Sequence, residues 1–373
     1  MSRYIDFARQ LLSEADITLN GDQPHDIQIH NESCLRKIIR GGSLALGETY
    51  MDGDWDSAQL DATMTRMMSA QLEEKVSKIK HLPLLLKTFL INPQSKERAF
   101  IVGEEHYDIG NDVYECMLDE NMVYTCAYWQ NSVDLSAAQL AKLDLVCQKI
   151  GLKSGDHVLD IGCGWGSFAH YAASRYGAKV TGVTVSKEQM RLAQQRCAGL
   201  DVNFVLQDYR DIQGCAVFDH VVSLGMFEHV GYKNYRTYMV LVHPVLKDKG
   251  LFLLHTIGNK HKQIKTDPWI DKYIFPNGLI PSPAQIASGF EGLFVLEDWH
   301  NFGADYDRTL MAWYDNFTRR WHELQDRYSE RFKRMWTFYL LCSAASFRVR
   351  EHNQLFQLVL SKNGVAGGYL SKR

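Results

Sequence analysis

Between residues 137 and 258 the sequence alternates short apolar runs with longer segments of helical periodicity. The apolar runs are typical of buried strands. Parallel strands need a crossover connection, usually a helix, so this alternation predicts a parallel, doubly wound α/β sheet. The expected strands cover 157–162, 179–186, 202–208, 218–225 and 250–258, and the expected helices cover 137–152, 167–177, 187–199 and 234–247.

The N-terminal part of the chain has a different pattern. It begins with a helical segment over 4–12 and a strand-like segment over 26–30, which together predict a small α+β lobe. A polar, charged stretch at 91–100 separates this part from the alternating region. We therefore expect two domains, an N-terminal lobe over 1–93 and a larger α/β domain over 94–373.

Composition narrows the class of protein. The net charge of −3 provides no general attraction for nucleic acid. The eight cysteines include no C-x-x-C pair, so neither a metal site nor a disulfide framework is expected, and a reducing cytoplasm fits. The first residues lack the apolar core of a secretory signal, and no uncharged apolar run approaches the roughly 20 residues that span a bilayer.

A glycine-rich turn follows the first expected strand. Asp160 ends that strand, and Gly162 and Gly164 allow the backbone to turn sharply against a ligand. The spacing G-x-G-x-G after an acid differs from the dinucleotide fingerprint G-x-G-x-x-G. A carboxylate there would repel a pyrophosphate but suits the ammonium group of an amino-acid-bearing ligand. The segment resembles the first motif of Rossmann-like class I S-adenosylmethionine-dependent methyltransferases.

The next two strand ends also carry polar side chains. Thr184 and Gln189 can supply hydrogen bonds to the cofactor, although both can instead cap the following helix. Asp208 can accept a hydrogen bond from the adenine amino group, or it can be a solvent-exposed acid in a turn. We take the three residues as candidate cofactor ligands.

Glu228 follows the fourth expected strand, and His255 lies near the end of the fifth. A carboxylate at a strand end in a cofactor pocket is a plausible acid, base or orienting group, and an acid facing solvent at a helix start is equally plausible. An imidazole at this rim can titrate or donate to an anion, although a lone histidine is more often structural.

Residues 122–130, MVYTCAYWQ, place Cys126 among aromatic side chains. Cys126 precedes the first strand of the sheet, has no metal partner and has no neighbouring histidine to activate it, so a reactive thiol is not expected. We instead expect the segment to form a loop over the site, in which Tyr124 and Thr125 contact the cofactor. The backbone amide of Cys126 can matter more than its thiol.

Several motifs together resemble the cyclopropane-fatty-acyl-phospholipid synthases of bacteria, and the resemblance covers nearly the whole chain. They are GSLALGETYMDGDW, EHYDIGNDVYECMLDENMVYTCAYW, VLDIGCGWG, VTVSKEQ, GMFEHVG, LLHTIG, DPWIDKYIFPNG, EDWHNFGADYDRTLMAW and SERFKRMWTFYL. Cys342 lies one residue earlier than a cysteine that relatives often carry in the last helix, and we assign it no role.

The resemblance implies an activity and a set of site residues. In that family a methyl group passes from S-adenosylmethionine to a cis double bond in an unsaturated phospholipid acyl chain, and a bound bicarbonate ion removes a proton as a cyclopropane ring closes. The bicarbonate ligands map onto Cys126, Glu228, His255, Ile257 and Tyr306. Backbone amides of Cys126 and Ile257, with imidazole and phenol donors, would hold the anion, and Glu228 would accept from its hydroxyl and orient His255.

Aromatic faces stabilise a carbocation without quenching it, although any one of these rings can equally be core packing. The candidate rings near the motifs are Tyr124, Tyr128, Trp129, Phe227, Trp269, Tyr273 and Tyr306.

The resemblance also implies partners. We expect a homodimer in the cytoplasm, peripherally associated with the inner face of the membrane, where the unsaturated phospholipid is reached. The basic segments 259–265 and 329–336 and the apolar segment 81–90 are candidate membrane contacts, but each can also be ordinary surface or core. The N-terminal lobe would serve substrate, membrane or dimer contacts.

Three other readings stay open. One is a methyltransferase that leaves an unclosed methyl branch on a lipid or methylates a small amine. Another makes Cys126 the attacking thiol of a cytosine methyltransferase, although such cysteines follow the fourth strand. The third is a cofactor-binding regulator, which would have no need of Glu228, His255 and Tyr306 together.

Overall fold

The computed structural model describes residues 2–72, 75, 110–351 and 353–373. The expected boundary near residue 93 and the apolar segment 81–90 lie outside these described residues. The chain forms two compact units, each built from several stretches of sequence. The first contains Met1–Ile91, Lys265–Pro276 and Asp307–Asn353, and the second contains Asn92–Ile264, Asn277–Tyr306 and Gln354–Arg373.

The second unit is built on one seven-stranded sheet. Its strands are β3 (His157–Ile161), β4 (Lys179–Thr184), β5 (Val202–Leu206), β6 (Phe218–Leu224), β7 (Leu246–Asn259), β8 (Val295–Asn301) and β9 (Asn353–Ser361). They lie in the order β5-β4-β3-β6-β7-β9-β8. Strands β3 to β7 pair in parallel, which confirms the doubly wound α/β sheet, whereas β8 and β9 form an antiparallel pair that the alternating pattern does not predict.

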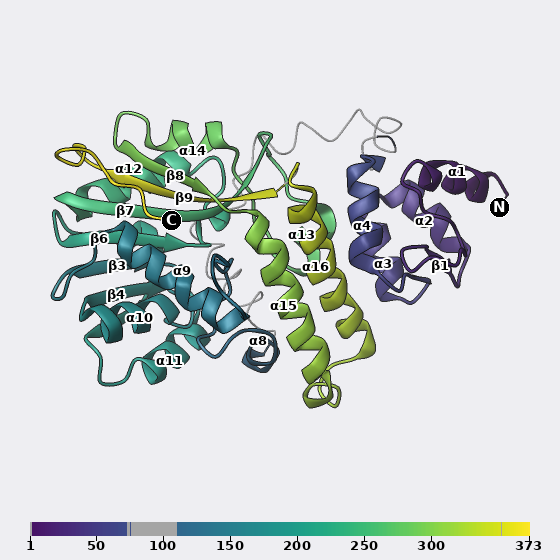
Figure 1. Ribbon diagram of the computed structural model, residues 1–373, viewed down its shortest axis with the longest axis horizontal. Coiled ribbons are helices and arrows are strands. Elements are labelled where there is room, and N and C mark those ends of the chain that lie inside the picture. Colours follow the sequence, from purple (N-terminus) through teal and green to yellow (C-terminus); the bar gives the residue numbers. More distant parts are fainter. Residues whose placement is uncertain (1, 73–74, 76–109, 352) are drawn as a thin grey trace. The chain divides into compact units, whose positions relative to one another are not determined.

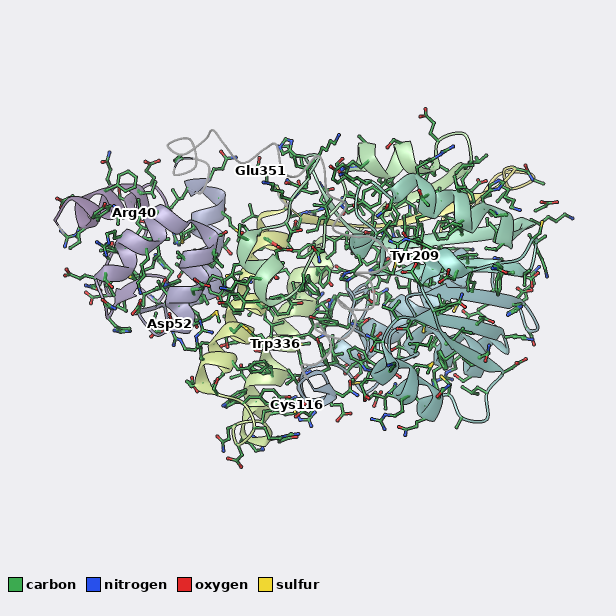
Figure 2. The ribbon with its side chains drawn as sticks, turned by 180° about the vertical axis from the view of Figure 1, so that it is seen from behind. Arg40, Asp52, Cys116, Tyr209, Trp336 and Glu351 are labelled. Carbon is green, nitrogen blue, oxygen red and sulfur yellow. The ribbon has the colours of Figure 1, made fainter. Side chains whose placement is uncertain are left out.

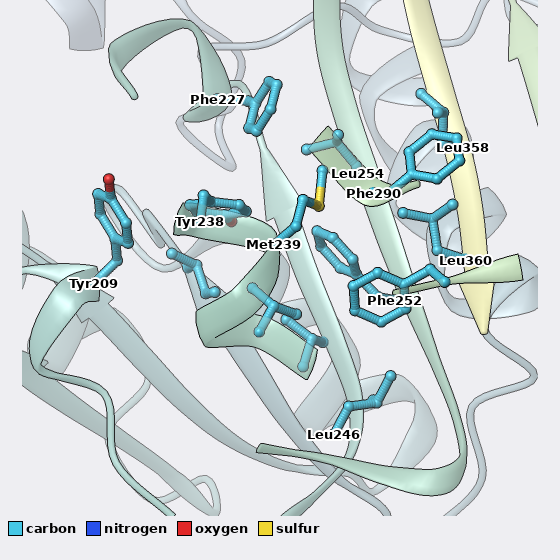
Figure 3. Packing of buried hydrophobic residues seen from close by; sticks show 14 of the residues in the cluster. Tyr209, Phe227, Tyr238, Met239, Leu246, Phe252, Leu254, Phe290, Leu358 and Leu360 are labelled. Atoms are coloured by element: carbon cyan, nitrogen blue, oxygen red, sulfur yellow. The ribbon is translucent and has the colours of Figure 1, made fainter. Parts of the chain in front are cut away.

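Helices cover both faces of this sheet. The helices of the second unit are α8 (Asn111–Met117), α9 (Leu135–Lys149), α10 (Ser167–Tyr176), α11 (Lys187–Arg196), α12 (Tyr235–Val245) and α14 (Pro283–Phe290). Successive strand residues point to opposite faces. Val158 accordingly packs in one buried cluster with α9, α10 and α11, whereas Leu159 packs in a second cluster with α12 and α14. Figures 1 and 3 show these helices and the second cluster.

The first unit is mainly helical. It contains α1 (Ser2–Ser13), α2 (Ser33–Gly41), α3 (Ser43–Met51), α4 (Leu60–Ser69), α13 (Pro268–Tyr273), most of α15 (Ala304–Arg320), α16 (Glu330–Val349) and the short pair β1 (Gln28–Ile29) and β2 (Trp55–Asp56). Trp336 on α16, labelled in Figure 2, is fully buried. The N-terminal helices thus share one unit with α13 and α16, although the sequence pattern suggests separate domains.

One arginine joins three elements of the first unit. Arg348 on α16 donates to both carboxylate oxygens of Asp307 at 2.9 Å and to Asp61 at 2.7 Å.

We expect Arg348→Met to lower the free energy of unfolding by about 1–2 kcal/mol, because two partly buried carboxylates lose their charged partner. Arg331→Met, which breaks a more exposed ion pair with Asp52, should cost about 0.5 kcal/mol or less. Denaturant unfolding followed by tryptophan fluorescence measures both, and equal losses would contradict a special role for Arg348.

Candidate active site

The glycine turn after β3 forms a close backbone cradle. Gly162 has φ +82° and its amide donates to the carbonyl of Val183 at 2.9 Å, and a Cβ there would lie 2.6 Å from the side chain of Met226. Gly164 also has a positive φ, of +53°, but a Cβ there would meet no atom of the described residues within 4 Å. The turn therefore requires the left-handed backbone and leaves open space beside Gly164, as a bound ligand needs.

Asp160 is a buried carboxyl at the end of β3. It is 2% exposed, and burial raises its pKa to about 7, while the ammonium of Lys142 opposes that rise. Lys142 on α9 is itself fully buried, and burial lowers its pKa to about 8. The two groups therefore form an electrostatically linked pair, in which the lysine favours the charged carboxylate that an ammonium ligand would need.

The side chains at the next two strand ends make local hydrogen bonds. Thr184 donates to Gln189 at 3.0 Å, and the N-cap of α11 is Ser186, whose side chain accepts from the Gln189 amide. Asp208 is 1% exposed and accepts from the backbone amide and guanidinium of Arg210 at 2.9 and 3.1 Å. Asp208 is therefore buried and paired with Arg210, and it is not the solvent-exposed acid that was the alternative expectation.

Glu228 lies in a short 3₁₀ helix, Phe227–His229, directly after β6. Its Oε1 accepts from the amide of Ile257 at 2.6 Å. Its Oε2 is buried and finds no hydrogen-bond partner within the described part of the chain. Burial raises the pKa of this carboxyl to about 7. Glu228 therefore offers one open acceptor oxygen in a dry position, and the solvent-facing alternative does not hold.

His255 lies on β7 opposite Leu224, at the end of β6. Its Nδ1 is 3.2 Å from the side-chain amide nitrogen of Gln357, and its Nε2 is buried with no hydrogen-bond partner among the residues described. Burial, with smaller contributions from Lys142 and Lys149, holds its pKa well below 6.5, so the ring is neutral. Gln357 thus contacts the imidazole, and the role of Glu228 in orienting His255, which the resemblance implies, stays a prediction.

The loop that carries Cys126 is fastened at several points. Gln139 on α9 donates to the Thr125 carbonyl at 2.9 Å, and Lys142 donates to the Thr125 hydroxyl at 2.7 Å. The Trp129 amide donates to Asp305 at 2.8 Å. Cys126 lies between these anchors and is fully buried.

The loop also reaches the ends of the two strands that carry the polar groups. A Cβ on Gly225, three residues before Glu228, would lie 2.6 Å from the Thr125 methyl group. Phe302 packs edge-on against Tyr128 at 5.3 Å and against His255 at 5.9 Å between ring centroids. Tyr306 follows the Asp305 anchor and is 8% exposed. The fold therefore brings the loop, the β6 end and the β7 end to one region of the second unit.

The expected aromatic wall divides into two groups. Tyr124 packs with Tyr114 at 5.2 Å, next to the glycine turn that carries Trp165. Phe227 stacks on Tyr235 at 4.4 Å inside the core of the second unit, and Trp269 is 1% exposed in the first unit. Phe227 and Trp269 are therefore core residues, which is the alternative to a role in stabilising a carbocation.

Three polar residues that support the site have no distinguishing motif. Gln139 and Lys142 occur three positions apart on α9, and Gln357 lies on β9. All three side chains are fully buried, although lysine and glutamine are rarely buried without a partner. In α9, the only sequence signal for these residues is that two polar residues lie at positions i and i+3 on a mainly apolar helix face. The sequence of β9 contains no comparable signal for Gln357.

The pair formed by Lys142 and Asp160 gives a testable result. In Lys142→Met the carboxyl loses its neighbouring positive charge, so the pKa of Asp160 rises and the pH midpoint for cofactor binding moves upward. Lys149→Met is the matched control, because Lys149 is equally buried on the same helix but faces Asp298 and His300. Calorimetric titration with S-adenosylhomocysteine at several pH values measures the midpoint, and the same midpoint in Lys142→Met and wild type would contradict the pairing.

Known proteins share this architecture. Residues 94–358 match the family model described as mycolic acid cyclopropane synthetase. The chain is 53% identical to the cyclopropane-fatty-acyl-phospholipid synthase of Escherichia coli (strain K12), over 97% of this chain and 94% of the relative. It is 35% identical to the tuberculostearic acid methyltransferase UfaA1 of Mycobacterium tuberculosis, over 90% of this chain and 83% of the relative. The solved structure of mycolic acid cyclopropane synthase CmaA1 complexed with SAH and CTAB has a TM-score of 0.64 at 29% identity, covering 70% of this chain and 98% of that one.

Proposed function

Because the chain belongs to the mycolic acid cyclopropane synthetase family, we propose that it transfers a methylene group from S-adenosylmethionine to the cis double bond of an unsaturated phospholipid acyl chain, forming a cyclopropane ring. The observation that carries the proposal is the position of two buried polar groups, Glu228 and His255, at the ends of neighbouring strands. The side chain of Met226, two residues before Glu228, lies against the cofactor turn at Gly162. The match to the synthase of Escherichia coli extends over nearly the whole chain, N-terminal part included.

The residues at the glycine turn fit the cofactor. The Asp160 carboxylate suits its ammonium group, and the turn at Gly162 and Gly164 lets the backbone approach closely. Thr184, Gln189 and Asp208 would hold the nucleoside, and Tyr124 and Thr125 would cover the sulfonium. When bound, S-adenosylmethionine supplies the methyl group.

The buried polar atoms beyond the turn fit a small hydroxylated anion. Glu228 Oε2 is an acceptor and His255 Nε2 is the position of a potential donor, and both lack partners in the described regions. We propose that bicarbonate is held here, with Cys126, Ile257 and Tyr306 completing the site. The Ile257 amide acts through Glu228, since it donates to that carboxylate. When bound, bicarbonate supplies a weak base.

The chain's own residues then have three tasks. Burial of Cys126, Glu228 and His255 would exclude water, which would capture a carbocation on the acyl chain as an alcohol. The ring faces of Tyr128, Trp129 and Tyr306 would stabilise the positive charge without reacting with it. Glu228 and His255 would place the anion where the proton leaves. Ring closure rather than methyl branching depends on that placement.

A second candidate is a methyltransferase that leaves an unclosed methyl branch. The 35% identity to a tuberculostearic acid methyltransferase favours it over methylation of an amine. Both candidates use the same cofactor turn and differ only in the fate of the carbocation.

The lipid must be reached at a membrane surface. In the described part of the chain no helix combines the length and apolar character needed for a bilayer crossing. Within segment 329–336, Arg331 and Arg334 are already paired with Asp52 and Asp56. We therefore propose peripheral contact through other surfaces, among them exposed Lys262, and a homodimer as the assembly. The 1–93 lobe would contribute substrate, membrane or dimer contacts, with catalysis assigned to 94–373.

Incubation with methyl-labelled cofactor tests the substrate class. Phospholipid vesicles with cis-monounsaturated chains, vesicles with saturated chains and a set of small amines are offered separately. We expect label in the unsaturated lipid alone, with loss of the alkene signal by mass spectrometry and NMR. Label in an amine, or in saturated lipid, would overturn the proposal.

A further inference from the structure

Gln357 is the residue on β9 that contacts the imidazole of His255. The side chain of Gln357 is fully buried and that of His255 is 1% exposed. The amide nitrogen lies 3.2 Å from Nδ1, and the two residues lie on strands that are neighbours in the sheet. A polar side chain is costly to bury without a hydrogen bond, and the contact with Nδ1 supplies one for the amide nitrogen, whereas Gln357 Oε1 has no partner among the described residues.

We propose that Gln357 is a positioning residue, whose amide donates to Nδ1 of His255 and so fixes the proton of the neutral ring on Nε2. A neutral imidazole has one donor and one acceptor, so a hydrogen bond that makes Nδ1 the acceptor makes Nε2 the donor. Phe302 packs edge-on against the same ring and limits its rotation. The tautomer and the direction of the N–H bond are therefore set from outside the reacting groups.

This inference rests on the proposed function, because the Nε2–H group is useful only if an anion accepts from it. Glu228 Oε2 and His255 Nε2 are both buried without partners among the described residues. An acceptor and a donor in one dry site match bicarbonate, which has a hydroxyl group and acceptor oxygens. With the opposite tautomer, the lone pair of Nε2 would face the anion and repel it.

The tautomer can be observed directly in the protein without lipid. Protein carrying ¹⁵N-labelled histidine is examined by two-dimensional NMR, and the His255 signals are identified by their absence in His255→Asn. We expect Nε2 protonated and Nδ1 unprotonated in the wild type. In Gln357→Leu, which is similar in volume, the two forms should mix. In Gln357→Glu the carboxylate should draw the proton to Nδ1.

Bicarbonate binding supplies the second measurement. Titration followed by the His255 signals should show about tenfold weaker binding or more in Gln357→Leu and Gln357→Glu. Gln354→Leu is the matched control on the same strand, because the Gln354 side chain accepts from Asn301 at the surface, and it should bind as the wild type does. Retained S-adenosylhomocysteine binding shows that each variant is folded.

Two results would overturn the inference. One is a wild-type ring protonated on Nδ1, and the other is an unchanged tautomer in both Gln357 variants. If instead the tautomer follows the expectation but bicarbonate leaves the wild-type signals unmoved, the bicarbonate assignment fails while the role of Gln357 stands.

Discussion

Glu228→Gln should lower the rate of cyclopropane formation by about 100-fold or more while cofactor affinity stays within about twofold of wild type. The amide keeps the shape of the side chain, and its oxygen can still accept from the Ile257 amide. However, it replaces the buried acceptor Oε2 with an NH₂ group. Two donors would then face each other, because the anion's hydroxyl hydrogen points at that position. The anion loses its placement although the cofactor site is untouched.

Turnover on unsaturated phospholipid vesicles and calorimetric titration with S-adenosylhomocysteine measure the two quantities. Glu291→Gln changes an exposed carboxyl of the same unit and should alter neither. Wild-type turnover in Glu228→Gln at saturating bicarbonate would remove Glu228 from the catalytic site. Loss of cofactor binding would instead place it at the cofactor.

Asp160→Asn should weaken cofactor binding by about 10- to 100-fold near pH 8, because a charge-assisted hydrogen bond becomes a neutral one. The pH dependence gives a stronger test. With a pKa raised to about 7 by burial, the wild-type carboxyl protonates as the pH falls below 7. A protonated carboxyl no longer attracts an ammonium group, so wild-type affinity should fall with decreasing pH. The asparagine variant should be insensitive over the same range.

Titrations with S-adenosylhomocysteine from about pH 5.5 to about pH 8, a range around the pKa of Asp160, measure the cofactor affinity of both proteins. Asp201→Asn alters an exposed acid of the same unit and should keep the wild-type pH profile. A wild-type affinity that is constant across this range, or an asparagine variant that retains the wild-type slope, would show that Asp160 does not bind the cofactor ammonium.

The sequence is informative where local pattern and fold agree. The central strands β3 and β6 and residues 250–256 of β7 are largely buried and mainly apolar, and their ends meet at one edge of a parallel sheet. Asp160, Glu228 and His255 therefore stand out by position alone. The structure shows each of them buried, which decides between alternatives that composition leaves open.

The remaining features depend on contacts between distant segments. Gln357 approaches His255 across 102 positions, through a strand that belongs to no alternating unit. Lys142 looks like a surface lysine in sequence, yet it is buried beside Asp160. Arg348 joins α16 to Asp61 on α4 and to Asp307 on α15, which are 287 and 41 positions away in sequence. No local pattern encodes such pairings, because burial is decided by the packing of elements that the pattern treats separately.

The most direct test of the central claim is the number of deuterium atoms retained from a trideuteriomethyl-labelled cofactor in the lipid product. Ring closure by loss of a deuteron from the new methyl group leaves two of the three deuterium atoms on a ring carbon, with no alkene remaining. We predict this product, formed only when bicarbonate is present. Retention of all three deuterium atoms on a methyl branch, or a ring formed at the same rate without bicarbonate, would contradict the account.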